Sequence, residues 1–292
     1  LGDGAALLDW NGPISAELLL MPSDNRVFKN VIPGLPELPK GWTASHLLVG
    51  GTPLRPSIEG ETGFEWMLLE GPEFFRGDLQ LRHSGDSLAV DGSVRQAGRP
   101  IVRTKGSFQT GLPEALNWLA GSGQKPPLHL WDHWWKEGQL RILAKDMEVA
   151  TIRSAMPLDV PLDGLLSGSM LIEGRPSSPR ASVGLSLSEG RMGEVELPVA
   201  MVSVNPGDEG YEVFSYSRIG EEEIRLEGTL GVDLKSDRLL RDKLKDENLA
   251  LSLHGAVPLA VLEAWTPRMD GAQGAVVISG GLEGSLLRPK PR

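Results

Sequence analysis

The stretch Ile224-Arg-Leu-Glu-Gly-Thr-Leu-Gly-Val-Asp-Leu234 decides the fold of this 292-residue chain. Each even-numbered position is apolar or glycine, whereas Arg225, Glu227 and Asp233 stand at odd positions. Successive side chains of a strand point to opposite faces, so this period of two predicts a β-strand with one apolar and one polar face. Similar alternation recurs at residues 14–20, 140–144, 183–187, 195–201 and 249–253. We therefore predict a sheet that turns one face to water.

Glycine and proline are frequent in the chain, with 36 and 22 residues. Both residues break helix interiors, so long helices are not expected. The hydrophobic share of 40% is too high for a disordered chain and fits strands between frequent turns. The predicted fold class is all-β with a few short helices. These helices are expected at residues 25–31, 113–119, 147–153 and 257–265, with the lysine-rich stretch 239–244 as a further candidate.

The chain is acidic, with 29 Lys and Arg against 39 Asp and Glu and a formal charge of −10. This balance argues against a nucleic-acid partner and against docking on anionic lipid headgroups, although not against contact with acyl chains. The absence of cysteine excludes disulfides, thiolate metal sites and cysteine nucleophiles. No apolar run reaches the roughly 18 residues of a membrane span. Because the chain begins with Leu1 rather than Met and stops abruptly at Arg292, we interpret it as a piece of a longer protein.

One order of elements recurs three times along the chain. Each copy runs from a strand through a short helix to a strand bounded by glycines, and it ends in a glycine followed five residues later by proline. The bounded strands begin at Gly41, Gly164 and Gly274, and the terminal pairs are Gly51 with Pro56, Gly174 with Pro179, and Gly284 with Pro289. The starts are 123 and 110 residues apart, which is too far for a small solenoid repeat. This spacing predicts a module of many strands stacked on its neighbour.

At these residues the sequence resembles the TamB family, the inner-membrane subunit of the translocation and assembly module. That family belongs to the AsmA-like group of bridge-type lipid transfer proteins. Its recurring phrase is close to Leu-x-Gly-x-Leu-x-x-x-Leu-x-Val-x-Gly-Thr-x-x-x-Pro and follows a short amphipathic helix. Residues 42–56, 162–179 and 273–289 are similar to three copies of the phrase, although only the first keeps the threonine, at Thr52. The second copy continues through residues 183–192 much like the family's next strand and turn.

The resemblance implies an elongated β-sheet folded lengthwise into a taco-shaped groove (β-taco) with an apolar lining. Residues 1–128 and 129–246 would be two groove modules and residues 247–292 the truncated start of a third, all parts of one continuous groove. The full protein would be anchored in the inner membrane outside this fragment, cross the periplasm and meet an outer-membrane barrel partner of the assembly family (TamA-like). Its implied role is non-enzymatic and needs no cofactor. It would carry phospholipid acyl chains, with outer-membrane protein assembly as the alternative.

A groove for acyl chains needs an uncharged apolar lining, since each buried methylene contributes about 0.8 kcal/mol. The alternating strands supply such residues. The expected lining residues are Leu18, Leu20, Leu140, Ile142, Met170, Ile172, Leu185, Leu187, Leu197, Val199, Ile224, Leu226, Leu230, Val232, Leu251 and Leu253. Alternation alone fits the closed core of a sandwich or barrel equally well. With the resemblance, we expect the open groove.

Two other residue groups were considered as sites. His129 and His133 have the i, i+4 spacing of helical metal ligands, but the glutamate of a zinc peptidase is missing between them, and we expect no metal there. The largest aromatic group is Trp118, Trp131, Trp134 and Trp135. These indoles fit a sugar platform or a membrane-facing patch, or a plug that packs a helix against the sheet, which we favour.

The sequence contains no catalytic signature. It has no Gly-x-Ser-x-Gly, P-loop or dinucleotide fingerprint, and no pair of carboxylates stands out, so we do not expect an enzyme. Two alternatives to lipid transport remain open. One is a scaffold that offers free sheet edges to outer-membrane protein strands, and the other is a carbohydrate-binding sandwich built on the tryptophans.

Overall fold

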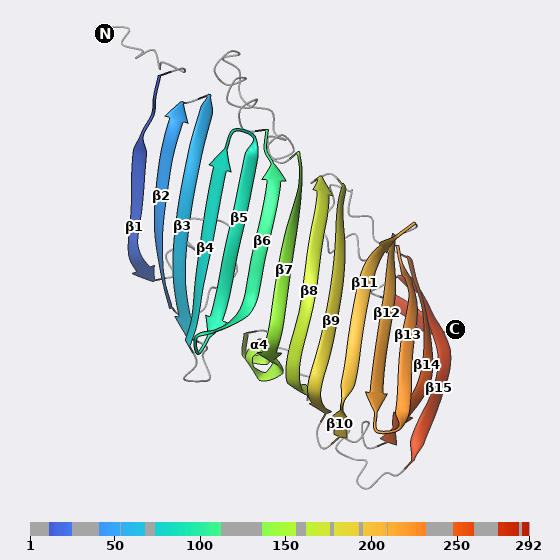
Figure 1. The fold of residues 1–292 in the computed structure, drawn as a ribbon. Coiled ribbons are helices and arrows are strands. Elements are labelled where there is room, and N and C mark those ends of the chain that lie inside the picture. Colours follow the sequence, from blue (N-terminus) through green and yellow to red (C-terminus); the bar gives the residue numbers. More distant parts are fainter. Residues whose placement is uncertain are drawn as a thin grey trace. The chain divides into compact units, whose positions relative to one another are not determined.

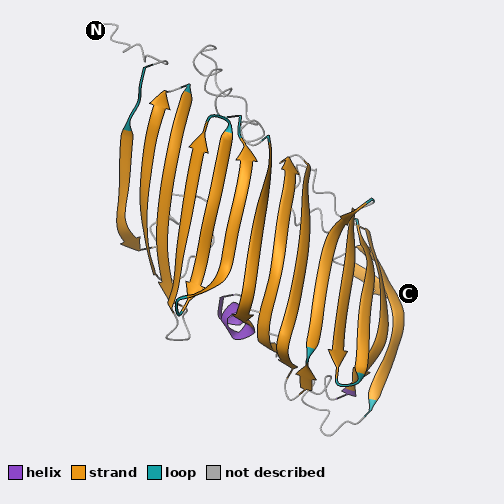
Figure 2. Cartoon of the chain, viewed as in Figure 1, coloured by secondary structure: helices purple, strands orange, loops and turns teal. Residues whose placement is uncertain are grey.

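The computed structural model places most of the chain in extended strands. It describes residues 12–24, 41–52, 54–67, 74–111, 136–155, 162–175, 178–192, 195–208, 210–231, 248–259, 274–285 and 288–291. Within these ranges the chain is all-β, apart from one helix of seven residues and the helical residue Leu259 that follows the strand ending at Pro258 (Figures 1 and 2). The predicted fold class is confirmed at this level.

The strands of the first half are β1 (Ala16–Asp24), β2 (Gly41–Thr52), β3 (Arg55–Met67), β4 (Phe74–Ser84), β5 (Ser87–Gln96), β6 (Arg99–Gln109) and β7 (Glu137–Glu148). Then come α4 (Val149–Ala155), β8 (Leu162–Arg175), β9 (Ser178–Met192), β10 (Val195–Leu197), β11 (Val199–Gly207), β12 (Gly210–Ile219), β13 (Glu222–Leu230), β14 (Asn248–Pro258), β15 (Ala275–Ser285) and β16 (Arg288–Pro291). Some consecutive strands are joined by turns of two residues, for example β4 to β5 and β5 to β6.

The strands belong to one antiparallel sheet whose order follows the chain. Each strand is hydrogen-bonded to the next from β1 to β16, except that β9 pairs with both β10 and β11. Contacts divide the chain into two compact units. Unit 1 comprises Leu1–Leu140 and Gly174–Pro176, and unit 2 comprises Arg141–Glu173 and Ser177–Arg292. Each unit is described separately below.

The three sequence repeats correspond to three similar hairpins. These hairpins are β2–β3, β8–β9 and β15–β16, and each follows a single strand, namely β1, β7 or β14. The glycine that ends each repeat has a positive φ, 86° at Gly51, 99° at Gly174 and 106° at Gly284. Glycine adopts this conformation without strain, which explains its recurrence where the chain turns back. The register pairs Gly51 with Pro56 and Gly284 with Pro289.

The helix predictions have mixed outcomes. The helix expected at 147–153 exists as α4, which starts two residues later because β7 runs through Glu148. The helix expected at 257–265 does not begin at Val257, because β14 continues to Pro258. The next residue, Leu259, is helical. Residues 260–265 and the helices expected at 25–31, 113–119 and 239–244 lie outside the described residues.

Few hydrophobic side chains are buried within the described residues. In unit 2, Leu187, Leu197 and Ile219 form a small core, against which Val149 of α4 packs. Phe75 and Ile101 are buried in unit 1. By contrast, many large apolar side chains are exposed, for example Leu18, Leu79, Leu185 and Val202. The strands therefore leave much of their apolar surface accessible.

Candidate functional site

The register gives unit 1 one apolar face. Directly paired residues of antiparallel strands point to the same side of a sheet, so each row of partners defines a face. One such row contains Leu47, Gly60, Leu81, Val90 and Gly106. The other residues on this face from β1 to β6 include no Asp, Glu or Lys, and the one arginine, Arg99, lies beside the turn between β5 and β6. The result is an uncharged strip across six strands.

The one ionisable ring on this strip is buried and hydrogen-bonded. His83 is 4% exposed, and its Nδ1 lies 3.2 Å from the carbonyl oxygen of Pro56. Because a carbonyl only accepts, Nδ1 carries the proton, and Nε2 accepts from the Thr110 hydroxyl at 3.0 Å in the neutral ring. His83 is therefore a bonded part of the sheet rather than a free charge on its apolar face.

Unit 2 has the same division between its faces. A typical apolar row contains Leu185, Val202, Ser215, Leu226 and Leu253. On β11 to β15, the one charged residue that the register places on this face is Glu222, which lies beside the turn between β12 and β13. On β9 the register covers residues 183–187, which carry no charge. Both units therefore present an uncharged apolar face.

Leucine side chains on these faces lie over glycines of the neighbouring strand. A methyl carbon of Leu79 lies 3.1 Å from the place that a Cβ on Gly92 would occupy, and Leu140 approaches Gly106 equally closely, at 3.0 Å. In unit 2, Leu185 lies 2.6 Å from the corresponding point on Gly168. The side chains therefore fold down along the sheet instead of standing away from it. Because of this packing, the leucine side chains form a flat apolar surface that also covers the glycines.

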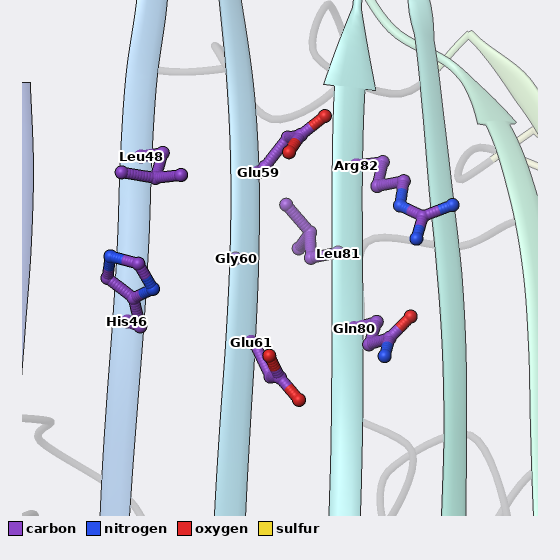
Figure 3. Close-up of a pocket in the computed structure, with 8 residues that line it drawn as sticks. All are labelled: His46, Leu48, Glu59, Gly60, Glu61, Gln80, Leu81 and Arg82. Atoms are coloured by element: carbon purple, nitrogen blue, oxygen red, sulfur yellow. The ribbon is translucent and has the colours of Figure 1, made fainter. Parts of the chain in front are cut away.

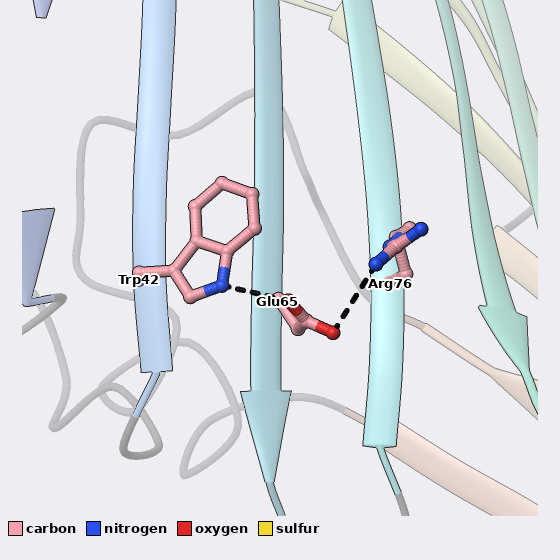
Figure 4. Close-up of polar contacts among 3 residues, drawn as sticks. All are labelled: Trp42, Glu65 and Arg76. Carbon is pink, nitrogen blue, oxygen red and sulfur yellow. Dashed lines mark hydrogen bonds and ion pairs between the residues drawn. The ribbon is translucent and has the colours of Figure 1, made fainter. Parts of the chain in front are cut away.

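The opposite face of unit 1 carries cross-strand polar contacts. The Trp42 indole donates from Nε1 to Oε2 of Glu65 at 2.7 Å, and Oε1 of the same carboxylate lies 3.5 Å from Arg76 (Figure 4). His46 lies 2.8 Å from Glu17 on β1. Arg76, His46 and Glu17 are exposed and Glu65 is half-buried, so each ion pair keeps contact with water and contributes little to stability. Their importance is that they make this face hydrophilic.

Unit 2 has a corresponding polar cluster on β12 and β13. The Tyr216 hydroxyl donates to Glu223 at 3.0 Å, and Arg225 donates to the other oxygen of the carboxylate at 3.0 Å. These bonds, first that from Tyr216 and then that from Arg225, lower the pKa of Glu223 below its ordinary value. The same carboxylate raises the pKa of Tyr216, because it accepts the phenolic proton. Arg225 also lies 5.8 Å from the centre of the Tyr216 ring.

A shallow hollow of about 140 Å³ lies on β2, β3 and β4. The residues drawn around it are His46, Leu48, Glu59, Gly60, Glu61, Gln80, Leu81 and Arg82 (Figure 3). The charged groups around the hollow face the polar side of the sheet, and their mixed signs give it no strong preference for one ion.

Most of the predicted lining residues fall on the apolar faces. Register places Leu18 and Leu20 there in unit 1 and Leu185, Leu187, Ile224, Leu226, Leu230, Leu251 and Leu253 in unit 2. Leu140 joins the unit 1 face by its contact with Gly106, and Ile142 follows two residues later on β7. Met170 and Ile172 follow Gly168 by two and four residues on β8 and therefore point to the same face as Gly168. Leu197 lies in the core of unit 2. Val232 lies outside the described residues.

Val199 is the exception, because it lies on the polar face. The sequence predicts one strand through residues 195–201, but the structure has two strands separated at Pro198. The interruption shifts the alternation by one residue, so Val199 pairs with Arg218 and Ala200 pairs with Leu187. Ala200, Val202 and Val204 take the apolar positions instead.

Sequence reasoning missed much of the unit 1 face. Ile58, Phe64, Leu81, Val90 and Val94 lie on it, although none was predicted. Glycines interrupt the alternation of apolar residues in β3 to β5. These glycines form the spaces into which neighbouring side chains fold, so spaced glycines within alternating strands are the signal that identifies such residues.

The described residues contain no group of three or more side chains suited to holding a metal ion. Within the same ranges, no helix has the length and apolar character needed to span a membrane. His129, His133 and the four tryptophans Trp118, Trp131, Trp134 and Trp135 lie outside the described ranges.

What the arrangement offers chemically is a broad uncharged apolar face. The opposite face carries the charged groups together with some exposed apolar side chains, such as Leu48, Met201 and Phe214. An uncharged apolar face binds apolar matter without directional contacts. No family model, curated protein or solved structure matches the chain.

Proposed function

We propose that this chain is a TamB-like segment whose apolar faces carry phospholipid acyl chains between the inner and outer membranes. The observation that supports this most directly is the uncharged apolar face in each unit, with accessible side chains such as Leu79 and Leu185. The proposed architecture is a sheet folded lengthwise into a β-taco groove, which the chain lines in successive modules. The proposed location is the periplasm, with the parent protein anchored in the inner membrane.

The physical basis is the transfer of methylenes from water to an apolar surface. Each methylene removed from water contributes about 0.8 kcal/mol, so a chain lying across several strands is held firmly without any specific contact. A charge in its path would interrupt this strip, and the interior rows of both apolar faces have none. The function is non-enzymatic and needs no cofactor.

The test is mass spectrometry of the purified chain under native conditions. We expect adducts with the masses of diacyl phospholipids, which disappear after delipidation and return on incubation with phospholipid vesicles. A chain that stays folded and shows neither co-purified nor rebound phospholipid would contradict the proposal.

A second candidate function is a scaffold for outer-membrane protein assembly, and the edge strand β1 favours it. Leu18 and Leu19 point to opposite faces of β1 and are 64% and 61% exposed. A long apolar edge is a template for an incoming strand. The parent protein would then work with an outer-membrane barrel partner (TamA-like). This candidate predicts that proline at Leu19 abolishes client binding and leaves lipid binding intact.

A further inference from the structure

Strand β12 carries half-buried hydroxyl groups on the unit 2 apolar face. Along it, Tyr211, Val213, Ser215, Ser217 and Ile219 point to that side. The neighbouring strands contribute only apolar groups beside the two serines. Ser215 stands between Val202 and Leu226, and Ser217 stands between Ala200 and Ile224. The hydroxyls therefore form a polar column that crosses an otherwise apolar face.

Neither serine hydroxyl has a side-chain hydrogen bond to a described residue, unlike the Tyr211 hydroxyl on the same face. The Tyr211 oxygen accepts from the backbone N–H of Ala181 at 3.3 Å. In unit 1, Ser45 and Thr62 on the apolar face bond to each other at 3.0 Å. Ser215 and Ser217 are half-buried, and neither has a side-chain hydrogen bond to any residue that the structure describes.

Acyl chains covering this face would remove water from both hydroxyls. A hydroxyl that loses water without gaining a partner opposes binding, so these positions select a ligand that supplies acceptors. A diacyl phospholipid supplies them at one place, the two ester carbonyls where the tails join the glycerol. Ser215 and Ser217 each provide one donor, about 7 Å apart along the strand.

We propose that Ser215 and Ser217 donate hydrogen bonds to the ester carbonyl oxygens of a bound diacyl lipid. The glycerol region then lies over β12, and the tails extend over apolar residues of the adjacent strands, such as Leu226 and Leu253 on one side. This inference rests on the proposed function and adds to it. It makes β12 a site that binds lipids with ester carbonyl groups more tightly than apolar chains without them.

The test compares two lipids that differ only in the ester carbonyls. Short-chain diacyl phosphatidylcholine and its dialkyl ether analogue have the same headgroup and nearly the same tails. Affinity is measured below micelle formation, by displacement of a fluorescent acyl probe from the full chain. We expect the unaltered chain to prefer the diester by about threefold to tenfold, the range for one or two net hydrogen bonds. The double variant Ser215→Ala/Ser217→Ala should bind both lipids equally.

Ser203→Ala is the matched control. Ser203 is also a half-buried serine without a described partner, but it lies on the opposite face, paired with Gly184 and Phe214. It should keep the preference for the diester. Equal binding of the two lipids by the unaltered chain would overturn this inference and leave the proposed function standing. Failure to bind either lipid would overturn both.

Discussion

Glycine is the residue that shapes the apolar faces, because it makes room for its neighbours. A Cβ on Gly92 would lie 3.0 Å from the carbonyl oxygen of Asp78 and 3.1 Å from a methyl carbon of Leu79. The leucine lies flat only because the glycine has no side chain. Gly63 on β3 offers the contrast, since a Cβ there would meet nothing within 4 Å.

This difference predicts opposite effects of one substitution at two glycines of unit 1. Gly92→Ala should lower the free energy of unfolding by about 1–3 kcal/mol, because the backbone oxygen cannot give way and the leucine must rise. Gly63→Ala should be neutral or stabilise by up to about 1 kcal/mol, through the reduced entropy of the unfolded chain. Urea unfolding of both variants measures the difference. Equal losses at the two sites would show that Leu79 does not depend on Gly92.

At the scale of elements, the alternation of apolar and polar residues predicted the strands and the face of each side chain wherever the alternation was uninterrupted. Ile224, Leu226 and Leu230 lie on one face of β13 as expected. The prediction failed at Val199 because the strand is interrupted at Pro198, and after this break the other set of alternate residues lies on the apolar face. The spacing of apolar residues in the sequence does not reveal such a shift. Cross-strand register was beyond prediction altogether, because it depends on pairing partners distant in the chain. The serine column on β12 became visible only with that register.

Strands β9 and β13 provide a test of whether the face of unit 2 is covered. Leu187 on β9 is 7% exposed and belongs to the small core, whereas Leu226 on β13 is half-buried on the same face. Leu187→Arg should lower the free energy of unfolding by several kcal/mol, because it buries an unpaired cation. Leu226→Arg should fold with a nearly unchanged Tm, because the guanidinium reaches water.

Thermal melts of the two variants supply the comparison. If Leu226→Arg loses as much stability as Leu187→Arg, a second layer covers β13 and the face is a closed core. The conservative variant Leu226→Met should be near neutral in either case, which separates the effect of charge from that of side-chain shape.

At the scale of the whole molecule, charge is partitioned by face rather than along the chain. The net charge of −10 is carried by the polar faces, turns and segments outside the described ranges, and the interior rows of both apolar faces have no charge. Composition indicated an acidic all-β protein, but it gave no information on this partition. In the proposed function, the charged face meets water while the other face holds apolar chains. The proposed transport function depends on that separation.

Photo-crosslinking from adjacent residues on opposite faces tests this separation most directly. A photoreactive side chain is placed at Leu226 or Arg225 in unit 2, and at Leu79 or Gln80 in unit 1, and the chain is incubated with phospholipid vesicles. Neighbouring residues of a strand point to opposite faces, so each pair compares the two faces at one place along the sheet. We predict lipid adducts from positions 226 and 79 and few or none from 225 and 80. Equal capture within each pair, or capture from 225 and 80 alone, would contradict the assignment of the apolar faces as the path for acyl chains.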